Sequence, residues 1–146
     1  MLVLIMIFWF AFFDRDIDSN EETIVLINSN DERIEMTVLI AESASQQKLG
    51  LMNHESLCKY CGMLFVYEED VHHGFWMKNT KIALSIAFIS KDGIIMEVQN
   101  MEPETTNTHK PEEPYRYALE VNQGFFQEES ITPGDLVSIP ARLRYN

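Results

Sequence analysis

The sequence predicts a small, mainly β domain, a compact sandwich or partly closed barrel of about seven short strands with one or two short helices. Two observations lead to this prediction. Short apolar segments recur along the chain, and some alternate with polar residues at the strand period of two. Clusters of Asn, Asp, Gly and Pro separate these segments as turns. With 146 residues, the chain has the size of one domain.

The N-terminus is an unbroken apolar run, MLVLIMIFWFAFF, at residues 1–13. As a helix it would extend roughly 20 Å, short of the ~30 Å hydrocarbon core of a bilayer. Its length suits the apolar region of a secretion signal, about 7–15 residues. No basic residue precedes the run and no small-x-small cleavage site follows it, so an uncleaved anchor or a start site placed slightly too late explains it equally well. A buried first helix or strand is the remaining alternative.

Composition divides the chain into three predicted parts. Residues 1–13 are expected to form a signal-like segment or membrane anchor, residues 14–22 an acidic linker, and residues 23–146 a single β-rich domain. We therefore expect the protein to be exported, with membrane contact only through its N-terminal segment.

The domain begins with two predicted strands. TIVLI (residues 23–27) is followed by the turn formers NSND and then by ERIEMTVLIA (residues 32–41), so the pair is expected to form a hairpin. The second strand has one apolar face, formed by Ile34, Met36, Val38 and Ile40.

A short helix and a central strand are expected next. In SASQQKLGLM, Ser43 or Ser45 can cap a helix that Gly50 limits to about two turns. GMLFVY (residues 62–67) is apolar on both faces, as a strand in the middle of a sheet would be.

The second half of the chain follows the same pattern. Segments 83–89 and 94–98 flank the hairpin turn Asp92-Gly93. The proline-containing segment 103–114 has no apolar period and predicts a long exposed loop. Two more strands are predicted at 117–121 and 136–139, with a short helix between them at 123–129.

The charge of the chain argues against one class of partner. It carries 23 acidic and 11 basic side chains, a net charge of -12. Binding to phosphate backbones needs a basic face, whereas the basic residues here are scattered. Nucleic acid is therefore not expected as a partner.

Several segments together resemble the domain-of-unknown-function 192 (DUF192) family. They are GLM (50–52), GMLFVY (62–67), FWMKNT (75–80), the apolar strand before Asp92-Gly93, ALE (118–120) and the late Gly134-Asp135. The resemblance runs from about residue 24 to 139. It implies a small, mostly β domain, often found behind a signal peptide or lipid anchor in prokaryotes. We therefore expect a periplasmic or membrane-anchored location. The resemblance implies no established activity, ligand or catalytic residue.

The sequence departs from the family pattern at two places. Ser85 follows Leu84 where the family usually has Asp, so this chain has no carboxylate at that position. Cys58 and Cys61 precede Gly62, where the family does not lead us to expect cysteines.

The segment GFWMKNT (residues 74–80) is the candidate binding site. As a strand, both of its faces would be apolar at the start and polar at the end, which is typical of a strand that leaves a core. Trp76 and Met77 are then expected to be buried, with Lys78 and Asn79 on the rim of a site. The alternative is that Lys78 covers the edge of the core and Asn79 opens a turn.

Two acids within predicted strands, Glu97 and Glu120, raise a second possibility. A glycoside hydrolase needs two carboxyl groups roughly 5–10 Å apart across a groove. Glu120 is also a candidate ligand-binding residue, and a structural ion pair between Glu120 and Lys78 is the simpler account.

The third candidate is Cys58-x-x-Cys61, with His54 nearby and His72 or His73 as a fourth group. One such pair is weak evidence for a metal site, because structural zinc sites usually have two. A disulfide, free thiols or redox chemistry are the alternatives.

Taken together, these patterns predict a binding or accessory module without catalytic residues or cofactors. Motifs for serine hydrolases, phosphate-binding loops, zinc proteases and dinucleotide-binding folds are all missing from the sequence. The expected partner is a small molecule, a sugar or an envelope protein. A carboxylate-based hydrolase and a metal or redox accessory protein remain as alternatives.

Overall fold

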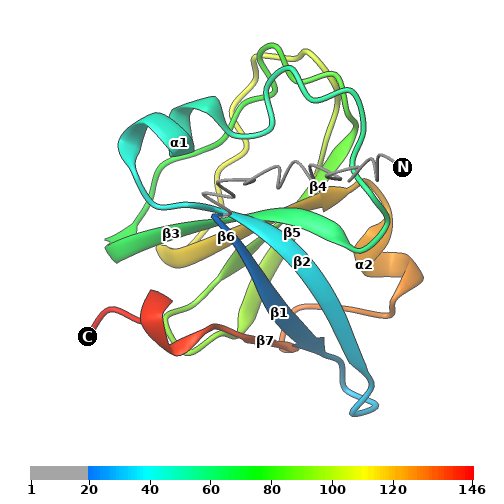
Figure 1. Cartoon of the computed structure of the whole chain (residues 1–146), viewed down its shortest axis with the longest axis vertical. Helices are drawn as coiled ribbons and strands as arrows, with labels where there is room; N and C mark the ends of the chain where they lie inside the picture. Colours follow the sequence, from blue (N-terminus) through cyan, green and yellow to red (C-terminus); the bar gives the residue numbers. More distant parts are fainter. Residues whose placement is uncertain (1–19) are drawn as a thin grey trace, which may run out of the picture.

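The computed structural model describes residues 20–146, which fold into one seven-stranded sheet curved into a half-barrel (Figure 1). The predicted segment 1–13 and most of the acidic linker lie outside the described residues. The strands are β1 (Glu21–Ile27), β2 (Arg33–Ala41), β3 (Cys61–Val71), β4 (Leu84–Ile89), β5 (Ile95–Met101), β6 (Tyr115–Asn122) and β7 (Leu136–Ser138), and the helices are α1 (Ala44–Leu49), α2 (Phe125–Glu128) and the 3-10 helix η1 (Ala141–Leu143). The prediction of a mainly β fold is confirmed.

The strand order of the sheet is β5-β4-β6-β3-β2-β1-β7. Only β2 and β3 run parallel, and every other neighbouring pair is antiparallel. The two edge strands approach each other at one end, where Ile94 forms an isolated bridge with Leu136. There the Val137 N–H donates to the Gly93 carbonyl at 2.7 Å. Of the two predicted architectures, the partly closed barrel is therefore the one observed.

The local patterns of the sequence account for most elements. The β1–β2 hairpin forms as predicted, with Ile24 opposite Met36. β1 starts at Glu21, two residues before the predicted start of the domain. Ser43 caps α1 in a capping box with Gln46, and Gly50, at φ 50°, ends the helix.

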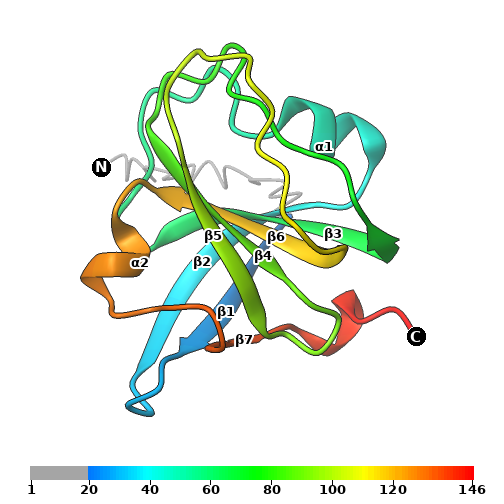
Figure 2. The same cartoon turned by 180° about the vertical axis from the view of Figure 1, so that it is seen from behind.

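The sheet buries apolar side chains on both faces. One face, with residues such as Leu26, Val38 and Leu119, lies inside the half-barrel. The other, with Phe65, Ile86 and Phe88, is covered by α1 and by the loops before β3, before β4 and between β5 and β6. Figure 2 shows these loops and α1 gathered at the same end of the sheet. Because both faces of the sheet are covered, the central strands carry apolar residues on both sides.

The segment 74–80 is not the strand that the sequence predicts. Only Phe75 forms a bridge, with His109 in the loop between β5 and β6, and a turn follows in which Asn79 has a φ of 55°. Met77 is fully buried as expected, but the Trp76 side chain is 45% exposed. The prediction failed because the main chain hydrogen-bonds to another loop, a contact that local alternation does not reveal.

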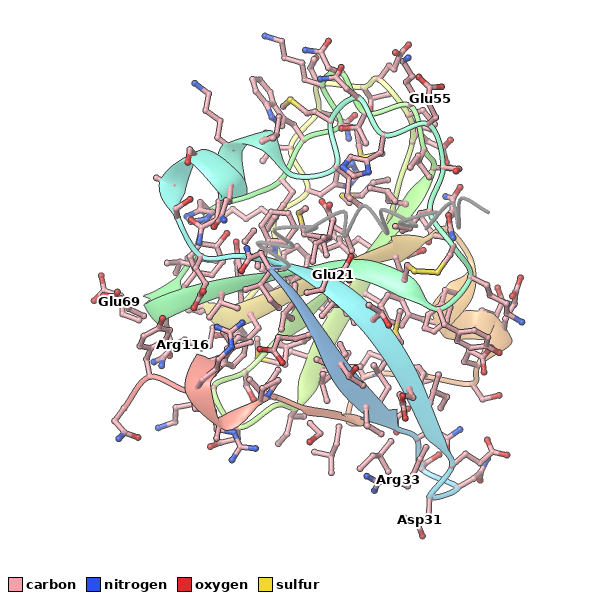
Figure 3. All side chains as sticks on the ribbon, in the orientation of Figure 1. Glu21, Asp31, Arg33, Glu55, Glu69 and Arg116 are labelled. Carbon is pink, nitrogen blue, oxygen red and sulfur yellow. A yellow bond between two sulfur atoms is a disulfide. The ribbon has the colours of Figure 1, made fainter. Side chains whose placement is uncertain are left out.

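Figure 3 shows charged side chains at both ends of the molecule. Asp31 and Arg33 lie at the tip of the β1–β2 hairpin, whereas Glu55 lies on the loops at the opposite end. Glu55 forms an ion pair with Lys81 at 2.9 Å, which joins two of these loops at the surface. The loop end also carries the candidate site.

Candidate functional site

An inner cavity of about 240 Å³ lies between the C-terminal end of α1, strands β3 and β6, and the segment 73–76. Its volume is well above the roughly 10–15 Å³ that one water molecule needs. The cavity is lined by Gln47, Lys48, Leu49, Gly50, Leu51, Met52, Phe65, Tyr67, His73, Gly74, Phe75, Trp76, Thr80 and Glu120. It therefore collects residues from five parts of the chain.

Helix α1 is fixed over the cavity by the side chain of Gln47. Its amide N–H groups donate to the carbonyls of Ala41 (3.3 Å), Glu42 (3.1 Å) and Val66 (2.9 Å). The last of these bonds ties the helix to β3. Because one side chain bonds three main-chain oxygens, its donors are fully used and it acts as a support for the cavity wall.

The opposite wall is built from loops that hydrogen-bond to one another. Phe75 and His109 exchange main-chain N–H···O bonds of 2.8 Å in both directions. Asn53 N–H donates to the Asn79 carbonyl at 3.0 Å. Gly74 has no room for a side chain, because a Cβ there would lie 2.9 Å from the His109 carbonyl oxygen. The segment 74–80 is thus held by its neighbours on both sides.

Glu120 lies at the sheet side of the cavity, on β6. It sits directly between Met63 of β3 and Ile86 of β4, and it is 4% exposed. Within residues 20–146 its carboxylate forms no hydrogen bond and no ion pair. Burial raises the pKa of the Glu120 carboxyl to about 8. At neutral pH the group is therefore mostly protonated in the folded protein.

Tyr67 and His73 form a hydrogen-bonded pair in the same cavity. The Tyr67 hydroxyl and His73 Nε2 are 3.2 Å apart, and the Tyr115 hydroxyl donates to the His73 carbonyl at 2.8 Å. Burial raises the pKa of Tyr67 to about 12. A hydrogen bond with Tyr115 opposes this shift, and the charge of Glu120 adds to it. Burial lowers the pKa of His73. The Tyr67 hydroxyl is accordingly protonated and neutral near pH 7.

Aromatic side chains supply much of the cavity wall. The rings of Phe65 and Phe75 meet edge to face, with centroids 4.9 Å apart. Trp76 stands at the opening, and the Lys78 Nζ lies 5.2 Å from its ring centroid. The cavity therefore combines apolar and aromatic surface with one buried carboxyl group.

An outer groove of about 590 Å³ adjoins the cavity. It is lined by Ser45, Lys48, Leu49, Met52, Trp76, Lys78 and Asn79. Four of these residues, Lys48, Leu49, Met52 and Trp76, also line the inner cavity. Leu49 is 55% exposed, so the groove is open to solvent and partly apolar.

The four residues predicted to bind a ligand all lie at this end of the sheet. Trp76 borders both spaces, Lys78 and Asn79 line the outer groove, and Glu120 lies in the inner cavity. The predicted ion pair between Lys78 and Glu120 is not formed: the exposed Lys78 ammonium lies over the Trp76 ring, and Glu120 is buried beneath. Their role in binding remains a prediction.

Glu97 does not line the cavity. Its carboxylate accepts hydrogen bonds from the Gln99 amide at 2.6 Å and the Glu112 N–H at 3.0 Å. Glu97 on β5 and Glu120 on β6 are separated by β4. On β4, Phe88 is opposite Glu97 and Ile86 is opposite Glu120, so the two acids are also offset by two residues along the strands. Strand spacing and rise make that separation roughly 12 Å along the sheet. The geometry does not support a carboxylate pair of the glycosidase kind.

Cys58 and Cys61 form a disulfide, which is one of the alternatives left open by the sequence. His54 completes no metal site with them: within the described part of the chain, no group of three or more His, Cys, Asp or Glu side chains is placed to hold a metal ion. The Ser85 hydroxyl donates to Asn100 at 2.8 Å and accepts from the Gly124 N–H at 3.2 Å. Ser85 is opposite Val121, inside the half-barrel and on the other face from Glu120.

Sequence reasoning missed Tyr67, Phe75 and the role of His73 in the cavity. The sequence pattern presents His73 only as a candidate metal ligand and the two aromatic residues as part of the core. Tyr67 and His73 are six residues apart, but Tyr115, which donates to the His73 carbonyl, lies 42 residues beyond it. A local pattern does not bring all of these residues together.

Comparison with known proteins relates the chain to one family and to solved structures. The DUF192 model, described as an uncharacterized ACR, matches residues 25–139. A candidate transcription regulator from Sinorhizobium meliloti 1021 has a similar structure, with a TM-score of 0.79, 33% identity and coverage of 81% of this chain and 92% of that chain. A protein of unknown function from Novosphingobium aromaticivorans DSM 12444 has a TM-score of 0.78 and 28% identity, covering 82% and 85%. No curated protein matches the sequence.

Proposed function

We propose that this chain, which belongs to the DUF192 family, binds a small ligand in the inner cavity and holds it without chemical change. The observation that carries the proposal is the buried carboxyl group of Glu120. It faces a cavity and has no partner among the described residues. An unpartnered buried polar group destabilises a fold, so its position at a cavity supports a role in binding.

The outer groove supports the same proposal. Trp76 lines both the groove and the cavity, so one ligand could contact the buried carboxyl group at one end and the exposed Trp76 and Lys78 at the other. Aromatic surface with a few polar groups at fixed positions is typical of small-molecule sites. The inner cavity alone is smaller than the roughly 300–1,000 Å³ of most drug-sized sites, which favours a small ligand or a small head group.

The role named for the Sinorhizobium relative is not carried over to this chain. A regulator that contacts DNA directly needs basic surface to bind phosphates. With 23 acidic and 11 basic residues, this sequence does not favour such contact. A small molecule, a sugar or a fragment of an envelope component therefore remains the proposed partner.

A ligand screen with two matched variants tests this proposal. We expect at least one small sugar, amine, carboxylate or envelope fragment to raise the melting temperature, because a ligand at 100 times its Kd stabilises the native state by about 2.7 kcal/mol. Trp76→Ala should reduce this rise. Tyr60→Ala is the matched control, since Tyr60 is 43% exposed but does not line the cavity.

Two results would contradict the proposal. An equal rise in Trp76→Ala and in the wild type would place the ligand elsewhere. No response to any of these compound classes would remove the support for a binding module.

We further propose that the protein works outside the cytoplasm. Two features support this: the apolar run at residues 1–13, which lies outside the described residues, and the Cys58–Cys61 disulfide, a bond that persists mainly in oxidising compartments. Among residues 20–146, no helix has the length and apolarity needed to cross a bilayer.

Fractionation of the native host tests the location. The protein is expected in the periplasmic or membrane fraction, and alkylation before and after reduction should show both cysteines blocked until a reductant is added. Deleting residues 2–13 should shift the protein to the cytoplasmic fraction. Full-length protein with free thiols in the cytoplasm would contradict the proposal.

A further inference from the structure

Glu120 is the only carboxyl group among the side chains that line the inner cavity, and it has no hydrogen-bond or ion-pair partner among the described residues. The Gln47 amide already donates to three main-chain carbonyls. The Thr80 hydroxyl donates to the Lys78 carbonyl at 3.2 Å, and the Tyr67 hydroxyl is paired with His73. Glu120 has no such partner. A ligand in the cavity therefore meets one carboxyl group without a protein partner, next to aromatic and aliphatic side chains.

This distribution discriminates between ligand chemistries. A sugar brings several hydroxyl groups, which need more hydrogen-bond partners than one carboxyl group supplies. A primary ammonium group has three N–H donors and meets the same problem. A methylated ammonium group has few donors or none, and its positive charge can face the carboxylate directly.

The aromatic lining fits the same chemistry. Phe65, Tyr67, Phe75 and Trp76 line the cavity. The faces of aromatic rings attract cations, and aromatic-lined sites are a recurring way to recognise quaternary ammonium groups. The net charge of -12 also favours the approach of a cation over that of an anion.

We propose that the inner cavity binds the methylated ammonium group of a small organic cation, with Glu120 as its counter-ion. This inference rests on the proposed binding function and names the class of ligand. The cavity of about 240 Å³ limits the buried part to a small head group, and the rest of a longer ligand would extend along Trp76 into the outer groove.

Binding should be coupled to the loss of a proton from Glu120. In the free protein burial raises the pKa of this carboxyl group to about 8, whereas a bound cation favours the ionised form. Affinity should therefore increase with pH, by up to about tenfold per pH unit, until about pH 8. The other titratable groups lining the cavity are Lys48, Tyr67 and His73. Lys48 is exposed, so its repulsion of a cation is screened by salt.

Calorimetric titration with three probes tests the proposal. Choline carries a methylated ammonium group, ethanolamine a primary one, and dimethylbutanol is the uncharged carbon isostere of choline. We expect choline to bind more tightly than both of the others. Glu120→Gln should weaken choline binding by at least about tenfold and abolish most of the increase in affinity between about pH 6 and pH 8. Far-UV circular dichroism and the melting temperature verify that the variant is folded.

The possible outcomes separate the two proposals. Dimethylbutanol binding as tightly as choline would overturn the role of the charge, and ethanolamine binding more tightly would overturn the role of the methyl groups. Choline binding unaffected by Glu120→Gln would overturn the role of Glu120. If none of the three probes binds but another compound does, in a manner sensitive to Trp76→Ala, the cation inference fails while the proposed binding function stands. If no compound binds, both fail.

Discussion

Glu120→Gln is expected to stabilise the protein progressively as the pH rises from about 4.5 to about 8. The pKa of Glu120 is raised by burial from an ordinary value of 4.5 to about 8. Between these values the unfolded chain has released the proton while the native protein still holds it. The contribution of the protonated group to stability is thus fully present below about pH 4.5 and is lost as the pH rises to about 8, at up to about 1.4 kcal/mol per pH unit. Gln cannot ionise, so the variant lacks this loss.

Urea unfolding at several pH values checks this expectation. The difference in unfolding free energy between variant and wild type should grow across the window and level off above about pH 8. Taking the difference cancels the contribution of His73, whose pKa is lowered by burial and which titrates in both proteins. Glu113→Gln, an exposed substitution outside the cavity, is the matched control and should keep the wild-type profile. Identical pH profiles for Glu120→Gln and the wild type would show that the carboxyl group is not held neutral by burial.

Truncating the adjacent residues Trp76 and Met77 to alanine is expected to change the free energy of unfolding by very different amounts. Met77→Ala should lower the free energy of unfolding by about 2–5 kcal/mol, because its fully buried side chain fills the core beneath the loops and its loss leaves a void. This is a large part of the ~5–15 kcal/mol that stabilises a typical domain. Trp76→Ala should cost at most about 1 kcal/mol, because the Trp76 side chain is 45% exposed.

The unfolding midpoints of Met77→Ala and Trp76→Ala test whether the two substitutions differ in their effect on stability, with Lys78→Ala as an exposed control. The sequence alone predicted that Trp76 and Met77 would both support the core, and the structure corrects this for Trp76. Its loss should therefore affect ligand binding more than stability. A loss of stability in Trp76→Ala equal to that in Met77→Ala would mean that the indole packs as part of the core, and the binding role of Trp76 would lose its structural basis.

The elements predicted correctly are those whose signal is local. The β1–β2 hairpin follows from alternation and a turn of four polar residues, and α1 follows from the Ser43 cap and the Gly50 stop. The hairpin at Asp92-Gly93 and the apolar β3 belong to the same group. Each pattern is specified by neighbouring residues, so it can be recognised without knowing the rest of the fold.

For the candidate site, the sequence singled out Trp76, Lys78, Asn79 and Glu120, and the structure places all four at one end of the sheet. It did not reveal that Glu120 is buried without a partner. That depends on β6 lying between β3 and β4, strands that are far apart in the chain. An isolated Glu within an apolar strand looks the same whether it ends in an ion pair, in water or in a cavity.

The sequence by itself therefore determined the type and approximate limits of most strands, the mainly β class, the family and a short list of polar residues near one segment. Only the tertiary structure decided that the sheet closes through Ile94 and Leu136, that segment 74–80 is a loop paired with the His109 region, and that Glu120 shares a cavity with Tyr67 and His73. The physical reason is that hydrophobic periodicity and turn chemistry act over a few residues, whereas burial, strand order and the pKa of a carboxyl group depend on which distant segments come to surround it.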